Sequence, residues 1–111
     1  MKFYIEAWKA KQAWLDLSTE ERTAYAEQVG PAVQQMIADG AEVISWGIND
    51  ADTDNRLDFD FMSIFKFPSD EFAKTFEGMV NAAGWYTYFD QVNIKSSPGT
   101  PQDVIAKMIA L

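Results

Sequence analysis

The side chains best suited to chemistry are two carboxylates that lie within runs of apolar and aromatic residues. Asp60 falls in the apolar run 57–67, and Asp90 falls in the aromatic run 85–94. A carboxylate that is partly buried among aromatic rings has a raised pKa, so it can act as a general acid or base. We therefore expect Asp60 and Asp90 to be the catalytic residues of any reaction that this chain performs.

Aromatic side chains and one amide accompany these carboxylates. Tyr hydroxyls could donate hydrogen bonds to an oxyanion or a phenolic substrate, and aromatic rings could shape an apolar pocket. If residues 85–94 form a strand, alternation places Tyr86, Tyr88 and Asp90 on one face. The candidate substrate-binding residues are Trp8, Trp46, Trp85, Tyr86, Tyr88 and Asn93.

The alternative is that these residues have only a structural role. Tyr and Trp would then fill the core and a dimer interface. The acids, including Glu6 among the apolar residues of the first expected strand, would form ordinary hydrogen bonds or ion pairs with Lys and Arg. The two interpretations differ in whether a carboxylate inside a cavity has a raised pKa.

The composition excludes several kinds of site. The chain contains no Cys and no His, which removes thiolate nucleophiles, Ser-His-Asp arrangements and the usual transition-metal ligands. Its six glycines form no phosphate-binding loop. The spacing of the three acids in 50–54 resembles the start of a calcium loop, but Asn55 and Phe61 occupy the positions that need Gly and Glu. We expect no metal and no cofactor, and a solvated acidic hairpin tip.

The charge balance bears on partners and location. A net charge of −8 disfavours nucleic acid and anionic membranes as partners, because binding to phosphates needs clustered Lys and Arg. The N-terminal residues do not resemble a signal peptide, and no apolar run is long enough to span a membrane. We therefore expect a cytoplasmic protein that binds neither nucleic acid nor membrane.

The order of elements predicts an α+β fold. Strands are expected at 2–8, 41–49, 58–67 and 85–94, and a Ser-Thr-Glu-Glu capping box at 18–21 begins a helix that runs to about 39. A second helix follows Pro68, and a terminal helix begins near Thr100. This β-α-β-β-α-β order is that of a ferredoxin-like antiparallel sheet with both helices on one face. We divide the chain into a ferredoxin-like domain, 1–95, and a linker with a C-terminal helix, 96–111.

The expected strand 58–67 has two different faces. Its odd-numbered residues are almost wholly apolar, whereas its even-numbered residues are apolar only at the centre, around Met62 and Ile64. The helices would cover one face of the sheet. The uncovered face would hold either one set of residues or its counterparts on the other strands, and that set is Tyr4, Glu6, Trp8, Asp60, Met62 and Ile64. Such a face is too apolar for solvent, which indicates a homodimer formed through the open sheet face. The terminal helix should dock on this chain or on a partner.

A resemblance supports this architecture. The order and length of the elements resemble those of the dimeric α/β-barrel superfamily. More narrowly, Trp46-Gly47, the strand 58–68 and the segment 84–93 resemble a family of small proteins of unknown function within it. The resemblance covers roughly residues 2–95 and implies a ferredoxin-like fold and a homodimer, but no particular reaction. The superfamily includes cofactor-free monooxygenases, haem-degrading enzymes, lactone isomerases and polyketide cyclases, together with members that only bind or have a structural role. The absence of His distinguishes this chain from the haem-binding members of the superfamily.

Two hypotheses for function follow. The first is a dimeric protein that binds a small hydrophobic or aromatic molecule without a predictable reaction. The second is a cofactor-independent monooxygenase, isomerase or cyclase that uses a carboxylate as acid or base. Both need a cavity between the sheet and its helices, and the sequence leaves open whether the protein is an enzyme.

Overall fold

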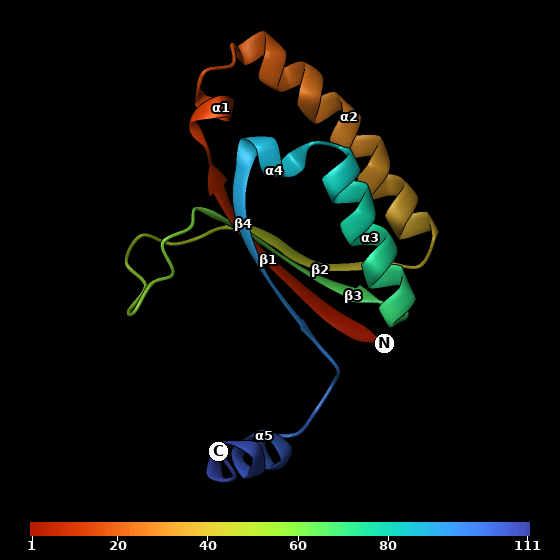
Figure 1. Cartoon of the computed structure of the whole chain (residues 1–111), viewed down its shortest axis with the longest axis vertical. Coiled ribbons are helices and arrows are strands. Elements are labelled where there is room, and N and C mark those ends of the chain that lie inside the picture. Colours follow the sequence, from red (N-terminus) through yellow and green to blue (C-terminus); the bar gives the residue numbers. More distant parts are fainter.

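A four-stranded antiparallel sheet forms the centre of the computed structural model, which describes residues 1–111 (Figure 1). Two long helices lie over the same face of this sheet, and two short helical turns join them to its strands. The elements in chain order are β1 (Lys2–Ala10), α1 (Gln12–Leu15), α2 (Thr19–Ala38), β2 (Glu42–Ile48), β3 (Phe61–Phe67), α3 (Asp70–Ala82), α4 (Trp85–Tyr88), β4 (Phe89–Ser96) and α5 (Pro101–Ile109). The expected α+β class and antiparallel sheet are confirmed.

The register between β1 and β3 decides which side chains share a face. The strands lie in the order β2-β3-β1-β4, and Tyr4 pairs with Phe65, Glu6 with Ser63 and Ile5 with Ile64. Because side chains alternate along a strand, each of these pairs points to one side of the sheet. Tyr4, Glu6 and Phe65 therefore face the helices, and the two Ile residues face away.

The first of the two sets expected on the open face, with Tyr4, Glu6 and Trp8 beside Met62 and Ile64, is wrong in its β1 residues. All three β1 residues are buried on the helix face, as the register requires. The open face instead carries two apolar rows across three strands. These rows are Ile94-Ile5-Ile64 and Val92-Ala7-Met62.

A cluster of aromatic side chains forms the core between the sheet and α3. Tyr4, Phe65 and Phe67 are almost completely buried, and the rings of Tyr4 and Phe76 meet edge to face at 5.4 Å. The Tyr4 hydroxyl donates a hydrogen bond to Glu77 of α3, at 2.9 Å. Helix α3 therefore packs directly on the sheet, through an apolar face and one polar anchor.

Helix α2 begins as the sequence predicts but packs less closely. The capping box is confirmed, since Ser18 Oγ accepts from the Glu21 N–H and Glu21 Oε1 accepts from the Ser18 N–H. Of its twenty residues, only Met36 is buried. Helix α2 therefore covers the sheet without filling the space beneath it.

The predicted strand 85–94 is wrong in its first half. Gly84 adopts a left-handed conformation with φ of 74°, and the next four residues form the helical turn α4. Lys11 satisfies two carbonyls of this turn, because its N–H donates to Tyr88 O and its Nζ donates to Tyr86 O. These contacts outweigh the strand preference of the aromatic residues, so Tyr86, Tyr88 and Asp90 do not share one strand face.

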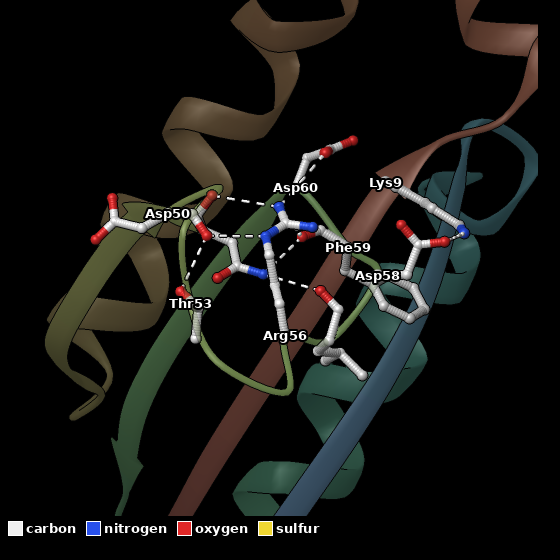
Figure 2. A network of polar contacts seen from close by, with 9 residues as sticks. Lys9, Asp50, Thr53, Arg56, Asp58, Phe59 and Asp60 are labelled. Atoms are coloured by element: carbon white, nitrogen blue, oxygen red, sulfur yellow. Dashed lines mark hydrogen bonds and ion pairs between the residues drawn. The ribbon is translucent and has the colours of Figure 1, made fainter.

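The predicted strand 58–67 begins three residues later, at Phe61. Figure 2 shows the reason, a network of side chains that bind the backbone of the loop 49–60. Arg56 donates hydrogen bonds to the carbonyls of Asp50, Asn49 and Phe59, and the Asn49 amide donates to those of Leu57 and Phe59. Carbonyls held in this way are not free to extend the sheet.

The last element, α5, lies apart from the rest of the chain at the end of β4 (Figure 1). None of its residues is buried, and its apolar residues Val104, Ile105, Met108 and Ile109 are all more than half exposed. Thr100 and Asp103 form a capping box at its start, so the helix has its own local support. No helix of the fold is long and apolar enough to cross a membrane.

Gly40 should be essential for the turn from α2 into β2. Its φ is +117°, and an added Cβ would lie 3.0 Å from Pro68 Cγ. We expect Gly40→Ala to lower the free energy of unfolding by about 1–3 kcal/mol, through backbone strain and this contact. Gly99→Ala is the matched control, because nothing lies within 4 Å of its added Cβ. Chemical denaturation of both variants measures the difference, and equal stabilities would contradict this assignment.

Candidate functional site

A cavity of about 260 Å³ lies between the sheet and helices α2 and α3. Sixteen residues line it, of which thirteen are hydrophobic. The sheet contributes Glu6, Trp8, Trp46 and Phe65 to the lining, and the helices contribute mainly aliphatic and aromatic side chains. The loose packing of α2 leaves this space open above the sheet.

Glu6 is the one carboxylate in the cavity lining. It projects from the middle of β1 and is only 6% exposed. The Ser63 hydroxyl donates to its Oε1 at 2.8 Å, and the Gln91 amide donates to its Oε2 at 2.6 Å. Burial raises the pKa of Glu6, and these two hydrogen bonds oppose part of that rise because they favour the ionised form. The cavity therefore contains a buried carboxyl group whose pKa is raised above its ordinary value.

Gln91 connects Glu6 to the cavity wall. Its Oε1 accepts a hydrogen bond from Trp85 Nε1 at 2.7 Å, and its amide nitrogen also donates to Asn93 Oδ1 at 2.8 Å. An indole N–H can only donate, so it orients the Gln91 amide with the nitrogen toward Glu6. The network joins β1, β3, β4 and α4 and fixes the position of the carboxylate.

Three tryptophans gather beside this network. Trp8 meets Trp46 at 5.6 Å and Trp85 at 5.9 Å between ring centroids, and both pairs are edge to face. Tyr25 of α2 lies 6.5 Å from Trp85 and completes the group. The rings of Trp46 and Trp85 therefore each stand at a steep angle to the ring of Trp8, whereas the Tyr25 ring is tilted by 32° from that of Trp85.

A wider groove of about 780 Å³ adjoins the cavity along α2. Six residues belong to both linings, including Trp8, Trp46 and Trp85. Trp14 of α1 and Ile48 of β2 line the outer part of the groove. It offers a route by which a small molecule could reach Glu6 from the surface.

The structure brings together only some of the candidate residues. Trp8, Trp46 and Trp85 line the cavity, and Asn93 is joined to Glu6 through Gln91. Tyr86 and Tyr88 lie on α4 outside the cavity lining, and Tyr88 packs against Trp14 and Tyr25.

The two candidate catalytic carboxylates lie elsewhere. The Asp60 side chain is 62% exposed in the loop before β3, where it is 3.9 Å from Arg56 (Figure 2). Asp90 is exposed on β4, opposite Lys9 of β1 and on the sheet face away from the cavity. Neither residue belongs to the cavity lining.

Sequence reasoning placed Glu6 among apolar neighbours but did not select it as a site residue. The signal was present in the alternation of Tyr4, Glu6 and Trp8, in which a carboxylate shares a face with two large aromatic residues. In the acidic loop 49–60, no group of three or more Asp and Glu side chains converges on one point.

The fold and site define an α+β protein with a buried carboxylate in an aromatic cavity. The chain belongs to a family of unknown function, DUF6616, whose sequence profile matches residues 1–111. This match includes α5 and is consistent with the resemblance to a small family of unknown function. No curated protein matches the chain.

Glu6→Gln should change how stability depends on pH. Because the pKa of Glu6 is raised in the folded state, its contribution to stability is full below the unfolded pKa and is lost as pH rises through the folded pKa. The neutral amide does not suffer this loss. We therefore compare the free energies of unfolding of the variant and the wild type. As the pH rises from about 4 to about 8, we expect the difference between them to shift in favour of the variant by on the order of 1 kcal/mol.

Urea denaturation across this pH range measures that difference. Asp60→Asn is the matched control, because it removes a carboxylate that is exposed to solvent. A difference between Glu6→Gln and wild type that stays constant with pH would contradict the assignment of a raised pKa to Glu6.

Proposed function

We propose that this protein binds a small hydrophobic or aromatic molecule in the cavity between the sheet and helices α2 and α3. The observation that carries the proposal is the buried carboxyl group of Glu6 within an otherwise apolar, tryptophan-lined space. A pocket that is mostly apolar, with a few well-placed polar groups, is typical of small-molecule sites. The apolar walls would supply affinity, and Glu6 would orient the ligand.

A second candidate is a cofactor-independent enzyme of the monooxygenase, isomerase or cyclase type. The raised pKa of Glu6 favours it, because a general acid or base works best when its pKa lies near the working pH. In this proposal Glu6 takes the acid or base role that was expected for Asp60 and Asp90, whose exposure to solvent disfavours them. Ser63 and Gln91 would hold its carboxylate in place.

We also propose a ferredoxin-like fold and a homodimer formed through the open sheet face. The β-α-β-β-α-β order with strands arranged β2-β3-β1-β4 supports the first part. The apolar rows through Ile5 and Ala7 support the second, because Val92 and Ile94 at their ends are 47% and 61% exposed. Charged residues border these rows, with Lys66 and Glu42 on one side and Lys9 and Asp90 on the other. A second copy would cover the apolar centre while leaving these charges in solvent.

Filling part of the cavity should weaken ligand binding. Ala32 of α2 lines the cavity, so a phenyl group at this position would occupy part of its 260 Å³. With the neutral fluorophore N-phenyl-1-naphthylamine as probe, we expect Ala32→Phe to weaken binding by about tenfold or more. Ala24→Phe is the matched control, because Ala24 lies on the same helix outside the lining. Unchanged affinity of Ala32→Phe, or no binding by the wild type, would count against the cavity as the binding site.

A charge placed on the open sheet face should separate the dimer. We expect the wild type to sediment at twice its chain mass of 12.5 kDa and Ile94→Asp to shift toward the single-chain mass. Burying an unpaired carboxylate between two apolar faces is strongly unfavourable. Ile48→Asp is the matched control, since Ile48 is 78% exposed on the opposite face of the sheet. A monomeric wild type, or a variant that remains dimeric, would overturn this interface.

A further inference from the structure

The only charged side chain that lines the cavity is acidic. Glu6 is the only residue in its lining that carries a formal charge when ionised, and no Lys or Arg lines it. Its other polar side chains are Tyr25, Gln28 and Gln35, which are neutral. The chain as a whole carries a net charge of −8. An anionic ligand would therefore meet an unpaired negative group in an apolar space, whereas a cationic ligand would meet its counter-ion.

The aromatic walls favour the same sign of ligand charge. The face of an aromatic ring carries partial negative charge and attracts ammonium groups, most strongly for Trp. The planes of Trp46 and Trp85 lie at 72° and 69° to that of Trp8, and Tyr25 stands beside Trp85. Rings set at steep angles around a small volume can surround an ammonium group on several sides.

The two hydrogen-bond donors to Glu6 orient its carboxylate but leave it without a counter-ion. Ser63 and Gln91 each occupy one carboxylate oxygen, so the carboxylate is held in a fixed orientation within the apolar lining. Each carboxylate oxygen can accept a further hydrogen bond or ion pair. A ligand cation next to Glu6 would supply the missing counter-charge of a buried carboxylate.

We infer that the ligand of this cavity is a hydrophobic ammonium compound, whose cationic nitrogen pairs with Glu6 between the tryptophan rings. Its apolar part would lie against the aliphatic side chains of α2 and α3, such as Val29 and Val80. This inference rests on the proposed small-molecule function and names the chemical class that the cavity selects. It predicts that the protein distinguishes a cationic ligand from a neutral ligand of the same shape.

A pair of isosteric probes tests the inference. Phenyltrimethylammonium and tert-butylbenzene have nearly the same shape and differ in the positive charge. We expect the wild type to bind the ammonium compound at least tenfold more tightly than the neutral compound, as followed by quenching of tryptophan fluorescence or by isothermal titration calorimetry. We expect Glu6→Gln to lose most of that ratio while it still binds the neutral probe.

Two further variants keep the result interpretable. Asp60→Asn removes an exposed carboxylate outside the cavity, and it should leave the ratio unchanged. Trp46→Leu should weaken binding of the ammonium compound more than that of the neutral probe, and Trp46 is half exposed, so this variant should fold even if Glu6→Gln does not. Circular dichroism of each variant establishes that it is folded.

The outcomes separate this inference from the function on which it rests. If the wild type binds the neutral probe as tightly as the ammonium compound, the inference of a cationic ligand fails while the apolar cavity remains the binding site. If Trp46→Leu weakens binding of both probes equally, the rings supply only apolar contact and the inference also fails. If the wild type binds neither probe nor N-phenyl-1-naphthylamine, the proposed function fails as well.

Discussion

The pairing register between β1 and β3 is the constraint on which the other features depend. A shift of one residue would move every side chain of β1 to the opposite face of the sheet. In the observed register Tyr4 enters the aromatic core, and Glu6 lies opposite Ser63, which donates a hydrogen bond to it. The same register leaves Ile5 and Ala7 on the open face. One alignment of two strands thus decides which side chains lie on the open face and which line the cavity.

A buried carboxylate is an unfavourable choice for stability alone. An apolar residue at position 6 would pack among Trp8, Trp46 and Phe65 without loss of hydration. The chain instead surrounds Glu6 with donors from β3 and β4 and orients one of them through the indole of Trp85. Such support is needed to hold a carboxylate at one position.

The sequence predicts the parts of this fold that depend on local patterns. The capping box at Ser18 and the alternation along β1 are examples, because each involves residues close in the chain. The turn α4 was missed because Lys11, some seventy-five positions away, satisfies its carbonyls. The start of β3 was missed because Arg56 and Asn49 bind backbone oxygens that a strand would use.

The site was predicted in its aromatic part but not in its carboxylate. Trp8, Trp46 and Trp85 stand out by residue type, and they do line the cavity. The choice among the acidic residues needed the register and the position of the helices, because Glu6 and Asp60 both lie beside apolar residues in the sequence. Only the three-dimensional arrangement shows that the first is enclosed and the second faces solvent.

The loose packing of α2 on the sheet determines how easily the size of the cavity could change. Helix α2 contributes many of the residues that line the cavity, and Met36 is its single buried residue, whereas α3 lines the cavity with Phe76, which belongs to the aromatic core. Substitutions at Val29 or Ala32 would change the size of the cavity, while the aromatic core between the sheet and α3 stays packed. The size of the cavity could therefore diverge, by drift or by engineering, through changes confined to a few positions on one face of α2.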